Sequence, residues 1–73
     1  MKITYDNQVD AMYIRLLDGP YQCRTVRLSD VVALNIGPAE ELVGIEILDA
    51  RKTLRFRDEP EIDLANLKVG VLE

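Results

Sequence analysis

The sequence predicts a mainly β, β-rich α+β fold: an antiparallel meander of about five strands with a short helical or irregular C-terminal segment covering the sheet. Apolar and polar residues alternate with a period of two through most of the first fifty residues, which is typical of strands with one buried face. Short segments rich in Asp, Asn, Gly and Pro interrupt this alternation and are typical of turns. With 73 residues the chain has room for one domain, in which we expect the meander over residues 1–48 and the covering segment over 49–73.

Each predicted strand follows from its own alternation, and each break follows from its turn residues. The strands are expected over residues 2–5, 11–17, 22–28, 31–36 and 42–48. The residues expected to share the buried face are Ile3, Tyr5, Met12, Ile14, Leu16, Val26, Leu28, Val32, Leu34, Ile36, Val43, Ile45 and Ile47. The turns are expected over residues 6–8, 18–20, 29–30 and 37–41, and such short connections favour antiparallel neighbours.

The last third of the sequence has a weaker pattern. Residues 49–52 are compatible with one helical turn. Asp63 is a candidate N-cap for a short helix ending near Asn66, and residues 68–72 alternate as a final strand would, so both helix and strand remain open there. The apolar side chains available to cover the sheet are Leu54, Phe56, Ile62, Leu64 and Leu67.

These five apolar side chains are few for a sheet of five strands. In addition, a domain of this size buries only about 60–65% of its unfolded surface, so its core is marginal. Small domains are usually reinforced by disulfides, a metal or a partner subunit. The chain has no histidine and only Cys23, so neither an internal disulfide nor an ordinary zinc site is available. We therefore expect a homodimer.

The charge balance argues against several classes of partner. Thirteen acidic residues outnumber nine basic ones, so the net charge is −4, whereas nucleic-acid binders present a basic face. The one basic stretch, from Arg51 to Arg57, is followed at once by acidic residues, and nucleic-acid binding is not expected. No apolar run is long enough for a signal peptide or a membrane span, so we expect a cytoplasmic protein that does not bind a membrane.

Few side chains could support catalysis, and we expect neither an enzyme nor a cofactor. Histidine, the commonest general base, is absent. Cys23 lies beside Arg24, which could lower the pKa of a thiol, but a small packed side chain is the simpler interpretation. Ser29, beside Asp30, fits a turn better than a nucleophile.

Carboxylates are the only plentiful reactive groups. Glu46 stands among apolar residues, where a carboxylate normally needs a partner, and Arg15, Arg24 or Arg27 could form a cross-strand ion pair with it. Asp6 and Asp10 flank the first turn and suit a structural role there. The alternative is a small-ligand or divalent-cation site built from Asp6, Asp10 and Glu46, which requires the three to converge.

Three segments carry a resemblance to a known family. They are Met1-Lys2-Ile3-Thr4-Tyr5-Asp6, Val9-Asp10-Ala11-Met12-Tyr13-Ile14-Arg15-Leu16 and Leu42-Val43-Gly44-Ile45-Glu46-Ile47-Leu48-Asp49-Ala50. In order and spacing they resemble the domain of unknown function 2283 family of short prokaryotic proteins, over roughly residues 1–52. The signature positions carried over, with no role attached, are Tyr5, Asp6, Asp10, Tyr13, Gly44 and Glu46.

The resemblance implies a small β-rich protein without an assigned activity, and some relatives look like antitoxins encoded beside small toxins. Together with the residues themselves, it predicts a non-enzymatic protein-interaction module. Its expected partners are a second copy of the chain and a basic, toxin-like protein, which the acidic net charge would attract.

Overall fold

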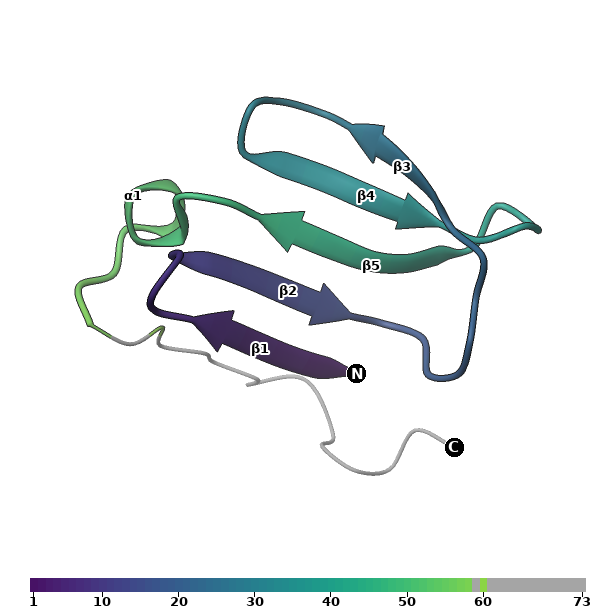
Figure 1. Cartoon of the computed structure of the whole chain (residues 1–73), viewed down its shortest axis with the longest axis horizontal. Coiled ribbons are helices and arrows are strands. Elements are labelled where there is room, and N and C mark those ends of the chain that lie inside the picture. The colour runs from purple at the N-terminus through teal and green to yellow at the C-terminus, as the bar shows by residue number, and fades with distance from the viewer. Residues whose placement is uncertain (59, 61–73) are drawn as a thin grey trace, which may run out of the picture.

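The chain folds into one five-stranded antiparallel sheet with a short helix at one end (Figure 1). The computed structural model describes residues 1–58 and residue 60. Its strands are β1 (Lys2–Asp6), β2 (Ala11–Arg15), β3 (Arg24–Arg27), β4 (Val32–Ile36) and β5 (Leu42–Ile47), and α1 spans Ala50–Leu54. The predicted fold class is thus confirmed, with each strand close to its expected place.

The strand registers place the alternating apolar residues on one face, called the apolar face here. Ile3 lies opposite Ile14, and Ile14 lies opposite Ile45 on the next strand. Ile45 in turn lies opposite Leu34, and Leu34 opposite Val26. Because directly opposed residues share a face, one apolar row crosses all five strands. The other face carries mostly polar side chains and is called the polar face.

The order of the strands departs from a sequential meander. It is β1-β2-β5-β4-β3, so β2 pairs with β5 rather than with β3. Eight residues connect β2 to β3 and must cross three strand spacings, about 14 Å, whereas eight extended residues reach roughly 26 Å. The Arg15 side chain donates to the Leu17 carbonyl at 2.8 Å and to the Gly19 carbonyl, and thereby shapes this crossing loop.

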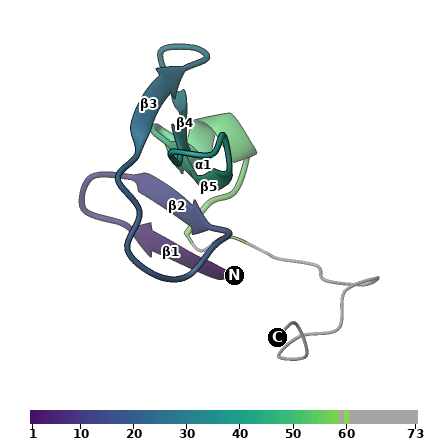
Figure 2. The ribbon, with the colours of Figure 1, turned by 90° about the vertical axis from the view of Figure 1, so that its right-hand side faces the viewer.

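A buried hydrophobic cluster lies where α1 meets one end of the sheet. Met12, Ile47 and Ala50 form a buried cluster, and Phe56 packs against it from the chain beyond α1. Ala50 is fully buried, and its small side chain allows α1 to approach β2 and β5 closely. In Figure 2, which views the sheet from its end, β1 and β2 are inclined to β3, as expected for a twisted single sheet.

The described residues include only the first part of the predicted covering segment, residues 49–58 and residue 60. Phe56 packs on the sheet as expected, whereas Leu54 is 44% exposed. Ile62, Leu64 and Leu67 lie outside the described residues, as do the predicted cap at Asp63, the helix ending at Asn66 and the strand over 68–72. Within residues 1–58, no helix has the length and hydropathy needed to cross a membrane.

Candidate functional site

The first signature residues meet where the β1–β2 hairpin contacts the start of α1. Here the Tyr5 hydroxyl donates a hydrogen bond to Oδ1 of Asp10 at 2.7 Å. The same oxygen accepts the backbone N–H of Arg51 at 3.1 Å, and the Arg51 guanidinium lies 3.8 Å away. One carboxylate thus joins two segments that are 41 residues apart in the sequence. We call Tyr5, Asp10 and Arg51 the latch.

Backbone geometry explains why an aspartate is suited to position 10, at the end of the turn before β2. Asp10 has a left-handed conformation with φ 56°, which Asp and Asn adopt more readily than other residues except Gly. This conformation closes the turn before β2, and it leaves the Asp10 carbonyl to accept the N–H of Ala50 at 3.0 Å. Asp10 therefore satisfies two N–H groups at the first turn of α1, where a short helix has no partners of its own.

Aromatic contacts complete the latch. The rings of Tyr5 and Phe56 meet edge to face, with centroids 5.3 Å apart and an interplanar angle of 80°. The Arg51 guanidinium carbon lies 5.8 Å from the Tyr5 ring centroid, within the range of a cation–π contact. Tyr5 is therefore held by a carboxylate, a cation and a second ring.

The latch shifts two pKa values in opposite directions. The hydrogen bond from Tyr5, together with the N–H and charge of Arg51, holds the pKa of Asp10 below its usual 3.8 despite partial burial. Partial burial and the hydrogen bond to Asp10 raise the pKa of Tyr5 above its usual 10.0, although the charge of Arg51 opposes this. Near neutral pH the network is a neutral phenol donating to an ionised carboxylate, which favours a structural contact over proton transfer.

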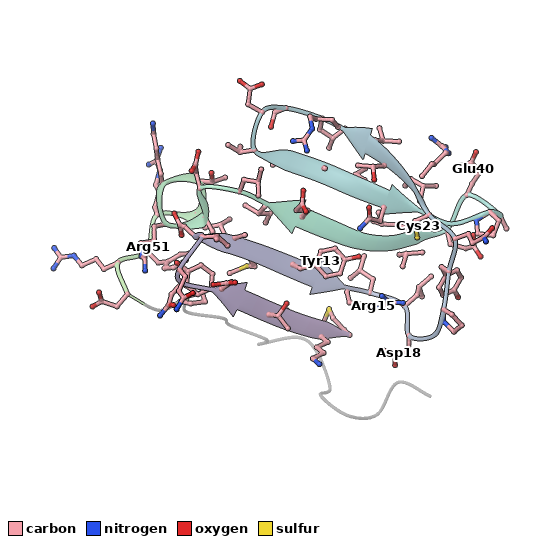
Figure 3. All side chains as sticks on the ribbon, viewed as in Figure 1. Tyr13, Arg15, Asp18, Cys23, Glu40 and Arg51 are labelled. Carbon is pink, nitrogen blue, oxygen red and sulfur yellow. The ribbon has the colours of Figure 1, made fainter. Side chains whose placement is uncertain are left out.

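A second group of signature residues lies on the polar face. Tyr13 and Glu46 are directly opposed on β2 and β5, and the Tyr13 ring extends along β5 over Gly44. A Cβ atom at Gly44 would lie 2.0 Å from the Tyr13 hydroxyl oxygen, so only glycine leaves space for the ring. The hydroxyl oxygen accepts a hydrogen bond from Nδ2 of Asn35 at 2.9 Å. Figure 3 shows Tyr13 at the middle of the sheet.

Glu46 lies beside Arg27 of β3, one of the three arginines considered from the sequence. Their closest charged atoms are 3.9 Å apart, and the side chains are 45% and 51% exposed, so this contact is a solvated ion pair. Arg24 pairs with Glu40 and Arg15 orders the crossing loop. The Glu46 carboxylate is therefore accessible to solvent and needs no buried partner.

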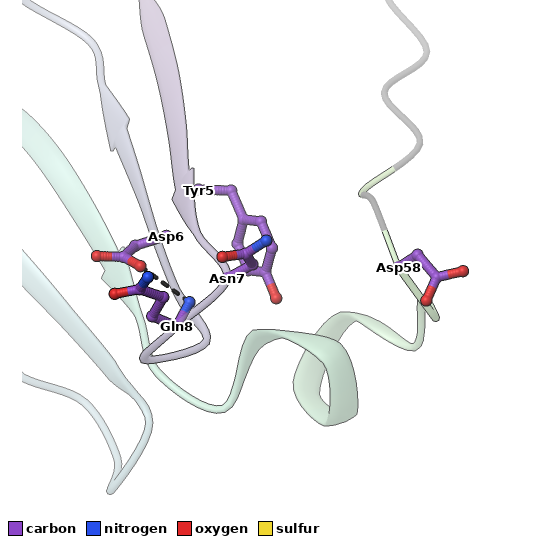
Figure 4. Close-up of a pocket in the computed structure, with 5 residues that line it drawn as sticks. All are labelled: Tyr5, Asp6, Asn7, Gln8 and Asp58. Atoms are coloured by element: carbon purple, nitrogen blue, oxygen red, sulfur yellow. Dashed lines mark hydrogen bonds between the residues drawn. The ribbon is translucent and has the colours of Figure 1, made fainter.

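Asp6 has a third environment, in an open hollow beside the first turn. Its Oδ1 accepts the backbone N–H of Gln8 at 3.0 Å, which is the local contact typical of a turn aspartate. The hollow has a volume of about 530 Å³ and is lined by Tyr5, Asp6, Asn7, Gln8 and Asp58 (Figure 4). Its two acidic residues, Asp6 and Asp58, come from segments far apart in the sequence.

The six signature residues thus fall into separate groups, and Asp6, Asp10 and Glu46 do not come together. Within residues 1–58, no three His, Cys, Asp or Glu side chains are grouped in a way that could hold a metal ion. The geometry gives the cation-site alternative no support. Ser29 accepts two backbone N–H groups within its turn, as expected of a turn residue. Cys23 is exposed, so its interpretation as a packed side chain was wrong.

Arg51 and Asn35 complete the two groups, and neither was singled out as a partner from the sequence. Arg51 stood within a basic stretch, and Asn35 carried no recognisable signal. Their importance depends on pairings across 41 and 22 residues, which local patterns do not encode.

Comparison with known proteins identifies one family. A family model described as a protein of unknown function, DUF2283, matches residues 2–51, more than half of the chain. The match includes the latch up to Arg51 and the whole polar-face group. No curated protein and no solved structure matches the chain.

Proposed function

We propose that this chain, which belongs to the DUF2283 family, is a non-enzymatic protein-interaction module that binds through its apolar face. The observation that carries the proposal is the incomplete covering of that face. Within the described residues the buried apolar side chains are Met12, Ala33, Val43, Ile47 and Ala50, and Ala33 belongs to the polar face because it lies opposite Glu46. The remainder of the apolar row stays partly accessible.

The accessible part of the apolar face includes β3 and β4. Within the described residues, α1 and Phe56 cover the end that contains Met12 and Ile47. Val26 and Leu34, which belong to the strands farthest from β1, are only half-buried. Contiguous apolar surface of this kind favours a protein contact, because burying it stabilises a complex by roughly 25 cal/mol per Å².

The proposed partners are a second copy of the chain and a basic, toxin-like protein, so that the role is antitoxin-like. The charge distribution supports a basic partner. Residues 59–73 contain four acidic side chains and one lysine, and so they supply three of the four net negative charges. We assign contact area to the sheet and long-range attraction mainly to the acidic side chains of this segment.

The test uses the tagged full chain as bait in its native cell, with the tag at each terminus in turn. The expected result is one small basic protein, identified by mass spectrometry and captured in stoichiometric amount. Val26→Asn should weaken its binding about tenfold, whereas Thr25→Asn should leave binding unchanged. The two residues are neighbours on β3 and face opposite sides of the sheet, which makes them a matched pair.

A second measurement checks the electrostatic part. Replacing Glu59, Glu61 and Asp63 by their amides in the full chain should slow association and reduce its dependence on salt. Capture that survives Val26→Asn, or fails equally with Thr25→Asn, would exclude the apolar face as the contact surface. An association rate that is the same at low and high salt would exclude the basic partner.

A further inference from the structure

Strand β1 forms an edge of the sheet in the described part of the chain, and its register reveals which backbone groups face outward. The N–H of Leu16 donates to the Val43 carbonyl at 2.8 Å, so even-numbered residues at this end of β2 hydrogen-bond with β5. By the alternation of antiparallel ladders, odd-numbered residues of β2 bond with β1. Their partners there are Lys2, Thr4 and Asp6.

It follows that the backbone N–H and C=O groups of Ile3 and Tyr5 point away from β2, toward an edge where the described residues place no further strand. Such an edge favours pairing with another strand, because unpaired backbone groups can complete a new ladder there. The sequence of β1 then decides which strand fits.

We propose that β1 pairs antiparallel with β1 of a second copy, about a twofold axis that passes through Thr4. In this register Ile3 lies opposite Tyr5 of the second copy, and these are the residues whose backbone groups face outward. Lys2 lies opposite Asp6 of the second copy at both ends of the new ladder. The strand Lys-Ile-Thr-Tyr-Asp is therefore complementary to itself in charge and in hydrogen bonding.

Side-chain placement supports the same register. Lys2, Thr4 and Asp6 are exposed and share the polar face, where they would form two ion pairs and a Thr–Thr pair. Ile3 and Tyr5 share the apolar face, where each would contact its counterpart. No charged residue is brought onto the apolar face by this pairing.

The hollow beside the first turn gives a second reason. It lies at the Asp6 end of β1, and two of its five lining residues, Asp6 and Asp58, are acidic (Figure 4). In the proposed register Lys2 of the second copy approaches this end of the strand. An ammonium group on a long side chain suits an open hollow with two acidic residues in its lining, and the Asp6 side of the hollow would receive Lys2 of the second copy.

The opposite edge of the sheet is less suited to self-pairing. The charged residues of β3 are Arg24 and Arg27, so two β3 strands would bring four arginines together. Glu40 and Glu46 lie beside these arginines, but they contact them within one chain. This difference in charge between the two edge strands favours self-pairing at β1 over self-pairing at β3.

Pairing at β1 has a consequence for the proposed function, on whose self-association it rests. The twofold axis through Thr4 is perpendicular to the sheet, so both apolar faces lie on the same side of a ten-stranded sheet. A partner could then bind across the junction, and one dimer would present twice the apolar surface of a single chain.

The experiment measures the dimer dissociation constant of the full chain by sedimentation equilibrium. Lys2→Glu and Asp6→Lys should each weaken self-association about tenfold, because each turns two attractive pairs into repulsive ones. An equimolar mixture of the two variants should dimerise as tightly as the wild type. In the mixed dimer the two introduced side chains, of opposite charge, face each other at one end of the ladder, and the native Lys2 and Asp6 face each other at the other end. Asp18→Lys, an exposed change in the crossing loop, is the control for net charge.

Recovery in the mixture separates a paired junction from damage to the fold, because a damaged chain would not recover when mixed. A monomeric wild type would overturn the inference, and so would a dimer that tolerates both variants. A monomeric wild type would also remove the second copy from the proposed partners. Neither result would affect binding of the basic partner through the apolar face, which the paired Val26 and Thr25 variants test separately. Ile3→Pro, which removes an outward N–H, should also weaken the dimer while leaving the β1–β2 ladder intact.

Discussion

Tyr5 and Tyr13, two of the residues singled out from the sequence, are held by opposite kinds of contact. In the latch, the Tyr5 hydroxyl donates to the Asp10 carboxylate, and a cation and a second ring surround it. On the polar face, the Tyr13 hydroxyl accepts from the amide of Asn35, and its ring fills the space that Gly44 leaves. The first tyrosine joins distant segments by charge, whereas the second fits neighbouring strands together by shape.

The difference explains why the signature residues, whose types could suggest catalysis, lie in separate places in the structure. Tyrosines beside acidic residues can indicate proton transfer, yet Asp10 accepts hydrogen bonds that fasten α1, and Glu46 lies at a solvated pair. The two groups should therefore respond differently to changes of size, charge and pH.

The largest effect is expected at Gly44. Gly44→Ala should reduce the free energy of unfolding by about 2–3 kcal/mol, because the new methyl group overlaps the Tyr13 ring. Chemical denaturation measures this value. In a Tyr13→Ala background the same change should cost less than about 0.5 kcal/mol, since the obstructing ring is gone. Equal costs in both backgrounds would contradict the packing role of Tyr13.

The next effect is expected in the latch. Asp10→Ala removes the acceptor of Tyr5 and Arg51 and places alanine in a left-handed conformation, so it should lower the unfolding midpoint. Asp10→Asn keeps an acceptor oxygen and tolerates that conformation, so it should be clearly milder. Hydrogen exchange at the Ala50 and Arg51 amides is the local readout. Unchanged exchange at both in Asp10→Ala would exclude the latch as the anchor of α1.

The stability that the latch contributes should depend on pH, because folding shifts the pKa values of Asp10 and Tyr5. The pKa of Asp10 is lowered by folding, so its contribution to stability is present above pH 4 and is lost as the pH falls through the folded value. The pKa of Tyr5 is raised, so its contribution is present below pH 10 and is lost as the pH rises through the folded value. Thermal unfolding of the wild type and of Asp10→Asn between pH 2 and 7 should differ in acid slope. Parallel curves would show that Asp10 is not coupled to folding.

The strands were predictable because their signal is local. Alternation placed Ile3, Ile14 and Ile45 on one face, and their register is what such a face requires. The strand order was not predictable, because the connection between β2 and β3 is long enough either to turn back or to cross two strands. The strand order is decided by contacts between residues distant in sequence, such as the hydrogen bond from the N–H of Leu16 to the carbonyl of Val43.

The candidate site divides in the same way. Asp6 as a turn former and Arg27 as one possible partner of Glu46 could be named from spacing and alternation. Arg51 and Asn35 could not, since each acts across the fold on a residue whose neighbourhood the sequence leaves open. Gly44 was a signature position with no role attached, and the structure shows that it leaves space for the ring of Tyr13.

The smallest effect is expected at the pair formed by Arg27 and Glu46. Arg27→Ala and Glu46→Gln should each change the free energy of unfolding by less than about 0.5 kcal/mol, because both side chains are about half exposed and their charged atoms are 3.9 Å apart. A double-mutant cycle should give a coupling energy of the same small size that vanishes at high salt. A coupling that persists in salt would mean that Glu46 is buried by a partner in solution. That result would place the polar face, rather than the apolar face, at an interface.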